Sequence, residues 1–223
     1  MTKKIQKLVT APGPGRHDTA PYKGHYGIYV AAFCLGLVVF AAGALLAHSH
    51  RPTGWEVTLF RGINDWPDKW QNLFQLITAF GTTWMAVASV VVAFAARFYR
   101  LAWRLALTIC GAYGVAFLAK HFIGRARPVE LLQHVHTRAI ETGMGFPSGH
   151  ATVITVIMLS LIPYLRNKWR WFPPLAIVLV CLSRLYLGVH FPLDIVGGVA
   201  LGTAAVAFVR ILPQSLRVLL RVD

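Results

Sequence analysis

The sequence predicts an all-α integral membrane protein with six transmembrane helices in one bundle. Of its 223 residues, 56% are hydrophobic and only 13% are charged, which is too apolar for an ordinary soluble domain. The hydrophobic residues also fall in runs long enough to cross a bilayer, which takes about 20 residues. Short basic clusters separate the runs. Because cytoplasmic loops of membrane proteins collect Lys and Arg, the net charge of +14 needs no nucleic acid partner.

The first 47 residues predict a tail followed by the first transmembrane helix. Residues 1–25 are basic, contain Pro12 and Pro14, and show little apolar periodicity, so we expect a cytoplasmic tail near anionic headgroups. Residues 26–47 are long enough to span the membrane. A cleaved signal peptide is the alternative, but the run exceeds a typical signal core and lacks a clear small-x-small cleavage site.

Residues 48–71 are polar but carry spaced large apolar side chains. The spacing of Trp55, Leu59, Ile63 and Trp66 fits a short helix lying at the membrane interface, and a plain loop fits nearly as well. The second span is expected at residues 73–98.

The remaining four spans follow at regular intervals. A basic turn leads into a third span that ends at residue 123, and a loop then extends to Phe146. The fourth span is expected at 149–165, the fifth at 173–189 and the sixth at 193–212. The membrane domain thus covers 26–213, and residues 214–223 form a second cytoplasmic tail.

The distribution of cations predicts the orientation. The N-terminal tail, the two basic turns and the C-terminus hold 14 of the 22 Lys and Arg residues. Placing these segments in the cytoplasm satisfies the positive-inside rule and puts both termini there. Five cations on the opposite side cluster in sequence with histidines, which indicates a chemical role: Lys120, Arg125, Arg127, Arg138 and Arg184.

Three motifs fall at helix ends that share the non-cytoplasmic side. The first is Lys120 with Arg127-Pro128, the second is the tetrapeptide at 147–150, and the third is the stretch 183–194. With six spans, these segments lie at the end of the third, the start of the fourth, and the junction of the fifth and sixth. We therefore expect the three motifs to form one site.

The first and second motifs predict a phosphate site. Ser148 precedes an apolar helical run and is suited to cap it, while Gly149 lets a ligand approach the backbone. Free N–H groups at a helix N-terminus bind anions. Lys120, Arg127 and Arg184 add three cations, and the guanidinium fork matches phosphate oxygens.

Two histidines and a carboxylate predict phosphoryl-transfer chemistry at this site. Asp194 can accept a hydrogen bond from one ring nitrogen of His190, which leaves the other nitrogen free to attack phosphorus. Protonated His150 can then deliver a proton to the departing oxygen and later assist an attacking water. Eight acidic residues in the chain, few of them near this face, give no carboxylate cluster for a metal. We therefore expect neither a metal nor another cofactor.

Together, K-x6-RP, PSGH and SR-x5-H-x3-D resemble the three-part signature of the type 2 phosphatidic acid phosphatase family. The motifs cover residues 120–194 in order, and the six-span layout extends the resemblance over most of the chain. The resemblance implies a metal-independent lipid phosphatase with His190 as nucleophile, Asp194 as its partner and His150 as proton donor. The phosphate ligands it implies are Lys120, Arg127, Ser148, Gly149 and Arg184.

The resemblance also implies a substrate class and a location. Small bacterial members act on undecaprenyl diphosphate, which we favour here, or on phosphatidylglycerol phosphate, with phosphatidate as a further candidate. The expected location is the plasma membrane, the inner membrane in a bacterium, with the site facing away from the cytoplasm. Two alternatives stay open: a lipid phosphotransferase, and a transporter or lipid-binding protein whose cationic pocket only docks phosphate.

Several polar residues have no predicted part in this chemistry. His134 and His136 fit a solvated loop better than a metal site, and the role of Arg125 is divided between phosphate binding and a headgroup contact. The three cysteines lie in apolar runs and indicate small core residues rather than disulfides. The sequence makes no prediction of the oligomeric state.

Overall fold

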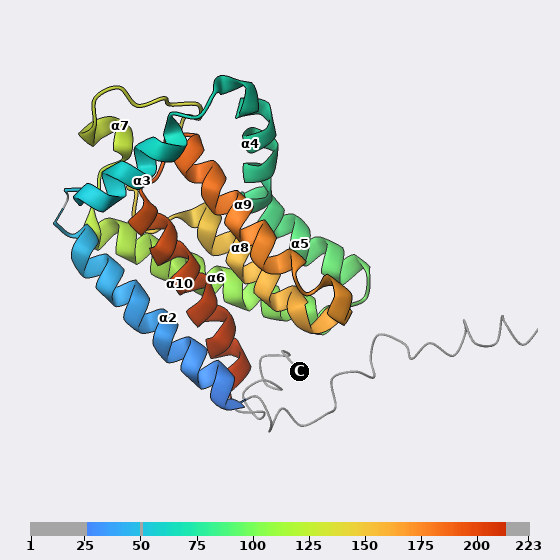
Figure 1. Cartoon of the computed structure of the whole chain (residues 1–223). Helices are drawn as coiled ribbons and strands as arrows, with labels where there is room; N and C mark the ends of the chain where they lie inside the picture. Colours follow the sequence, from blue (N-terminus) through green and yellow to red (C-terminus); the bar gives the residue numbers. More distant parts are fainter. Residues whose placement is uncertain (1–25, 50, 213–223) are drawn as a thin grey trace, which may run out of the picture.

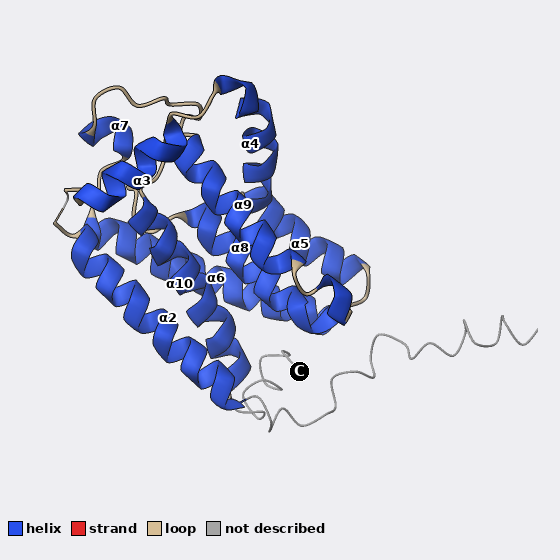
Figure 2. Ribbon diagram, viewed as in Figure 1, coloured by secondary structure: helices blue, strands red, loops and turns tan. Residues whose placement is uncertain are grey.

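The computed structural model describes residues 26–49 and 51–212, and this part of the chain is helical without strands (Figure 2). The predicted tails, 1–25 and 214–223, lie outside the described residues. The main helices are α2 (Tyr26–Ala47), α3 (Gly54–Asn64), α4 (Gln71–Thr78), α5 (Thr83–Ala95), α6 (Tyr99–Ile123), α7 (Pro128–Leu131), α8 (Gly149–Leu161), α9 (Phe172–Tyr186) and α10 (Pro192–Ile211). Short 3-10 turns add η2 (Asp68–Trp70), η3 (Ala79–Gly81), η4 (Ile162–Tyr164) and η5 (Asn167–Trp169).

Helix α10 is the central element of the bundle. It runs beside α2 (Figure 1) and also packs against α8 and α6. Small residues allow the close approach: a Cβ added at Gly36 of α2 would lie 2.9 Å from the carbonyl oxygen of Ala200. Such small-residue contacts are typical of helix pairs in membranes, where van der Waals packing replaces the hydrophobic driving force.

Helix α8 is buried between α5, α6, α9 and α10. Most of its residues are shielded from solvent, which suits a helix that is apolar on all sides. Glycines of α10 face it: a Cβ at Gly198 would lie 2.5 Å from the Ser148 carbonyl oxygen, and one at Gly202 would lie 2.8 Å from Thr155 Cβ. The start of α8 is thereby held close to the first half of α10.

The number of spans is smaller than the sequence predicts when only length and hydropathy are counted. In the described residues, three helical segments are long and apolar enough to cross a membrane: α2, the segment that begins with α6, and α10. A fourth is reached only if a bent pair counts as one span. The all-helical prediction is confirmed, but the count of six spans is not. Two of the predicted spans correspond to α8 and α9, which have only 13 and 15 residues.

The predicted second span, 73–98, is interrupted. The segments Asp68–Gly81 and Thr83–Ala95 meet at an angle of 54°. Thr82 ends the first segment and caps α5 by accepting a hydrogen bond from Met85 N–H. Gly81 lies against the start of α8, where an added Cβ would be 2.8 Å from His150 Cβ. The break therefore brings the α4–α5 corner to the helix end that carries His150.

The stretch 48–71 forms a short helix rather than a plain loop. Helix α3 buries Phe60 and Ile63 and leaves Trp55 and Leu59 exposed. A capping box starts it, in which the Glu56 carboxylate accepts the Thr53 N–H at 3.0 Å. Figure 1 shows α3 lying across the end of the bundle near the start of α10.

Candidate functional site

The three predicted motifs meet where four helix ends converge. Lys120 lies in the last turn of α6, His150 in the first turn of α8, and Arg184 in the last turn of α9. His190 occupies the α9–α10 junction, and Asp194 lies in the first turn of α10. The backbone ties two of these ends together, because Ser148 N–H donates to the Asp194 carbonyl oxygen at 2.9 Å.

A polar cavity of about 210 Å³ opens at this convergence. Gly81 and Thr83 from the α4–α5 corner line one side of it, together with Tyr113 of α6. Residues 141–144 of the loop before α8 also line it, as do five of the eight predicted site residues: Lys120, Arg127, Gly149, His150 and His190. The other three, Ser148, Arg184 and Asp194, are buried directly behind that lining.

The predicted N-cap of α8 is confirmed. Ser148 is the N-cap residue, and its hydroxyl accepts from Ala151 N–H at 3.5 Å. A Cβ added at Gly149 would meet nothing within 4 Å, so the backbone here borders open space in the cavity. The α8 N-terminus therefore presents its peptide N–H groups on the side where the cations gather.

The loop that precedes α8 holds Lys120 and Arg127, and α4 holds Arg184. Arg127 donates to the carbonyl oxygens of Gly143 and Val189, each at 2.8 Å. The Lys120 amine donates to the carbonyl oxygen of Met144. Arg184 donates to the Thr78 hydroxyl at 2.6 Å. These bonds restrain all three side chains before any ligand binds.

Glu141 occupies the centre of the cation cluster. Its Oε2 lies 3.1 Å from Arg127 Nη1, and its Oε1 accepts a hydrogen bond from Arg184 Nη2. The same two oxygens lie 3.7 Å from His190 Nε2 and His150 Nδ1, respectively. Burial opposes ionisation, but Arg184, the two histidines and Arg127 outweigh it and lower the pKa of Glu141 to about 2. An ionised carboxylate thus lies where two guanidinium groups and two imidazoles converge.

His190 is buried beside Asp194. Its Nδ1 lies 3.4 Å from Asp194 Oδ2 but makes no hydrogen bond. The opposite nitrogen, Nε2, faces the cavity and Glu141. Burial first, and then Arg184 and Arg127, hold the pKa of His190 well below its usual range. The imidazole is therefore neutral at pH 7, with Nε2 directed at the anion position.

Two buried charged residues near the site, Arg125 and Glu56, lie outside the predicted set of site residues. Arg125 is fully buried and donates to Asp194 Oδ1 at 2.8 Å and to Glu56 Oε2 at 2.9 Å. It contacts neither the cavity nor a headgroup, which removes both roles considered from the sequence. Glu56 had no predicted role, although its position three residues after Thr53 is a recognisable capping-box signal.

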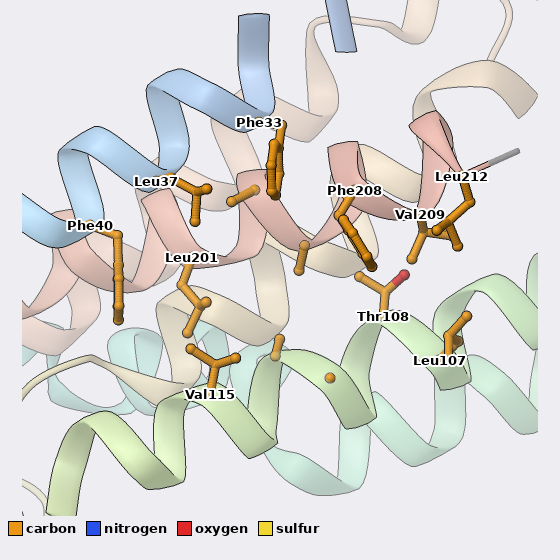
Figure 3. Close-up of a pocket in the computed structure, with 14 residues that line it drawn as sticks. Phe33, Leu37, Phe40, Leu107, Thr108, Val115, Leu201, Phe208, Val209 and Leu212 are labelled. Atoms are coloured by element: carbon orange, nitrogen blue, oxygen red, sulfur yellow. The ribbon is translucent and has the colours of Figure 1, made fainter. Parts of the chain in front are cut away.

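A larger cavity, of about 450 Å³, lies between α2, α6 and α10 and is lined by apolar side chains with the single exception of Thr108 (Figure 3). Phe33, Leu37, Phe208 and Val115 point into it from the three helices. None of the residues predicted to handle phosphate lies there, so we place the chemistry in the smaller, polar cavity. Within the described residues, His134 and His136 included, no three His, Cys, Asp or Glu side chains are grouped to hold a metal ion.

Comparison with known protein families shows which family the chain belongs to. The family model of the PAP2 superfamily matches residues 101–217, which contain all three motifs. The chain belongs to the PAP2 superfamily. The resemblance stated from the motifs is thereby confirmed, and the chain is a phosphatase of the PAP2 type.

Individual PAP2 relatives cover most of the fold. An undecaprenyl-diphosphatase of Sulfolobus acidocaldarius is 27% identical over 155 residues, 67% of this chain and 74% of that protein. A lipid A 4'-phosphatase of Porphyromonas gingivalis is 33% identical over 62% of this chain and 64% of its own length. The crystal structure of a transmembrane PAP2 type phosphatidylglycerolphosphate phosphatase from Bacillus subtilis matches with a TM-score of 0.60. It is 25% identical and covers 81% of this chain and 92% of that one. The PAP2 fold and these transmembrane neighbours identify the chain as a membrane lipid phosphatase.

Proposed function

We propose that the protein hydrolyses a lipid diphosphate or phosphate through a phosphohistidine on His190, with undecaprenyl diphosphate as the favoured substrate. The observation that carries the mechanism is the Glu141 carboxylate. It is an anion already held between Arg127 and Arg184, with a ring nitrogen of each histidine 3.7 Å away. A phosphoryl group that displaces this carboxylate would meet the same cations and the same two imidazoles.

Each step then uses a group whose position is known. His190 Nε2 attacks phosphorus while the bond to the leaving oxygen breaks, and His150 gives that oxygen its proton. Water next attacks the phosphohistidine with His150 as base, which frees His190 and releases phosphate. Lys120, Arg127, Arg184 and the α8 N-terminus stabilise the negative charge on the phosphoryl oxygens in both steps. No resident metal is assigned to either step.

The substrate proposal rests on the relatives and on the character of the surface. The relative that acts on undecaprenyl diphosphate aligns over 155 residues, while others act on lipid A phosphate and phosphatidylglycerol phosphate. Large apolar side chains are exposed on α2, α5 and α6, as expected for helices that face lipid. We place the protein in the plasma membrane, with the cavity on the non-cytoplasmic side and both termini in the cytoplasm.

Phosphate release in detergent tests the proposal. The protein would be given undecaprenyl diphosphate, phosphatidylglycerol phosphate and phosphatidate, each with and without EDTA. We expect release to persist in EDTA and to be fastest with the diphosphate. His190→Ala should lower kcat by at least about a thousandfold, because the covalent step is lost. The matched control is His121→Ala, an exposed histidine of α6 beside Lys120.

The controls separate the parts of the proposal. Turnover retained by His190→Ala would remove the nucleophile assignment. Faster release from a phosphate monoester would change the substrate and leave the mechanism intact. Labelled phosphate that appears on an added acceptor lipid instead of in water would identify a phosphotransferase.

A further inference from the structure

We propose that Arg125 and Glu56 are positioning residues that hold the Asp194 carboxylate against His190. The proposal rests on the proposed function, because it assigns to both residues an action through the histidine nucleophile. Neither belongs to the three motifs, and neither lines the polar cavity. Arg125 comes from the segment after α6, Glu56 from α3, and Asp194 from α10, so three distant parts of the chain meet at one point.

The Arg125 guanidinium bridges two buried carboxylates. Nη1 donates to Asp194 Oδ1 at 2.8 Å, while Nη2 donates to Glu56 Oε1 at 3.0 Å and to Oε2 at 2.9 Å. All three side chains are completely buried. The Phe191 ring covers the guanidinium, whose carbon lies 5.1 Å from the ring centroid. A planar fork with charge-assisted bonds on both sides fixes the orientation of each partner.

Glu56 is itself anchored at both oxygens. Oε2 accepts from Thr53 N–H at 3.0 Å within the capping box of α3, and Oε1 accepts from Leu193 N–H at 3.3 Å. The second bond reaches the first turn of α10, one residue before Asp194. Glu56 therefore sets the position of Arg125 relative to the helix that carries Asp194.

Each oxygen of the Asp194 carboxylate accepts one hydrogen bond from outside the cavity. Oδ1 is bound by Arg125, and Oδ2 accepts from Phe191 N–H at 2.9 Å. Oδ2 also lies 3.4 Å from His190 Nδ1. Without Arg125, Oδ1 would be a buried acceptor lacking its partner, and the carboxylate could rotate away from the imidazole. Positioning of this kind by an outer carboxylate or cation typically changes activity strongly although it touches no substrate.

The charge balance of the network gives Glu56 a second effect. Glu56 and Arg125 cancel, so Asp194 keeps its negative charge available when His190 becomes cationic on phosphorylation. The other charged groups that face His190 are Arg184 of α9, Lys120 of α6, and Arg127 and Glu141 of the connecting loop. His150 of α8 approaches the same anion position. Because these groups stay in place, neutralising Glu56 changes the field at His190 through Arg125 and Asp194.

Glu56→Gln tests the proposal in full-length protein with undecaprenyl diphosphate as substrate. We expect kcat to fall about ten- to one-hundredfold while KM changes by less than about threefold, because phosphate binding is untouched and the nucleophile is misoriented. The acid limb of the pH profile of kcat/KM should move to lower pH, because the buried network then carries one negative charge fewer and the imidazolium form of His190 is disfavoured. Arg125→Lys should also lower kcat, because an ammonium group lacks the planar fork that holds both carboxylates in fixed orientations.

Arg138→Gln is the matched control. The sequence grouped Arg138 with the cations expected to have a chemical role, but in the structure it does not line the polar cavity. This buried cation is bound to Asp68 and to the carbonyl oxygens of Asn64 and Tyr186 rather than to Asp194. Its loss should lower the thermal unfolding midpoint and leave kcat per folded molecule and the pH profile unchanged. If Glu56→Gln changes only the unfolding midpoint in the same way, the pair is a structural ion pair and the proposal is wrong.

A double variant covers the case in which a single variant does not fold. Glu56→Gln with Arg125→Gln removes one charge of each sign, so the net charge of the buried network is unchanged and the guanidinium bridge to Asp194 is lost. We expect this protein to fold and to keep a lowered kcat; recovery of wild-type kcat would overturn the proposal. His190→Ala, measured in the same assay, distinguishes failure of the proposed function from failure of the positioning role. If it is inactive while the Glu56 and Arg125 variants match the wild type, the proposed function stands and the positioning role is lost.

Discussion

Glu141 shows how a single carboxylate can stabilise a cluster of cations. Without Glu141 or a bound anion, the guanidinium groups of Arg127 and Arg184 would be buried like charges with no counter-ion between them, which is costly. The carboxylate neutralises part of that charge and accepts from both guanidinium groups. A phosphate group makes the same kind of contact with more oxygens. We infer that substrate binding exchanges one anion for another, and the cluster is never left unpaired.

The lowered pKa of Glu141 predicts a pH-dependent stability. Its pKa falls from 4.5 to about 2 in the folded protein, so the unfolded chain binds the proton more tightly. The stabilisation is therefore complete above about pH 4.5 and is lost as the pH falls towards 2. By linkage, it is on the order of 3 kcal/mol at pH 7.

Thermal unfolding in detergent between pH 3 and 7 measures this effect. Glu141→Gln should lower the unfolding midpoint at pH 7, and the difference from the wild type should shrink as the solution is acidified. Other carboxylates titrate in both proteins, so the difference isolates Glu141. A gap between the two proteins that stays constant with pH would contradict the assigned pKa.

At the scale of residues, the sequence predicted those members of the cavity lining that belong to the three motifs. His190, His150, Lys120 and Arg127 converge as expected, because their spacing is set by helix ends that the apolar runs already mark. The sequence predicted no role for Glu141 or Glu56, because nothing near a lone carboxylate in a loop or short helix indicates which cation it will pair with. Arg125 could not be assigned because the partner that decides its role lies 69 residues away in the chain.

At the scale of elements, the contact between α8 and α10 positions two residues of the candidate site. The first turns of these helices carry His150 and Asp194, and Ser148 N–H donates to the Asp194 carbonyl oxygen. The contact depends on Gly198, where an added Cβ would lie 2.5 Å from the Ser148 carbonyl oxygen and 2.9 Å from Ala151 Cβ. Backbone atoms cannot rotate out of the way, so one methyl group must push the two helices apart.

Gly198→Ala should therefore reduce both stability and turnover. We expect a loss of about 1–3 kcal/mol from overpacking and a fall in kcat of about tenfold or more from the displaced His150. Unfolding midpoints and phosphate release measure the two effects. Gly114→Ala is the matched control, because a Cβ at this α6 glycine meets nothing within 4 Å. Wild-type turnover in Gly198→Ala would show that the α8–α10 spacing tolerates change.

The elements themselves were predicted best where apolar runs are long and uninterrupted. The helices α2 and α10 match the predicted bounds closely, because a continuous apolar run offers no other stable state in lipid. The second span was predicted as one helix, whereas Thr82 breaks it and starts α5. Hydropathy averages over such a break, since the threonine hydroxyl and the adjacent glycine change the backbone without making the run polar.

At the scale of the whole molecule, the residues of the candidate site lie at one end of the bundle. The polar cavity lies at the Lys120 end of α6, whereas the apolar cavity lies further along α2, α6 and α10. Basic turns at Arg97–Arg104 and Arg166–Arg170 occupy the ends of the helices opposite the site. This polarity is the arrangement that the positive-inside rule requires if the cavity faces away from the cytoplasm.

Accessibility of single cysteines tests that orientation. Cys34, Cys110 and Cys181 would first be replaced by alanine, and one cysteine would then be introduced at Gln133 or Lys168, both exposed. Gln133 lies in the loop beside the polar cavity, and Lys168 lies in the basic turn between α8 and α9. In intact cells, a membrane-impermeant maleimide should label Gln133→Cys and should label Lys168→Cys only after the membrane is opened. Labelling of Lys168→Cys alone in intact cells would invert the proposed topology and place the phosphatase site in the cytoplasm, because the two positions lie at opposite ends of the same helices.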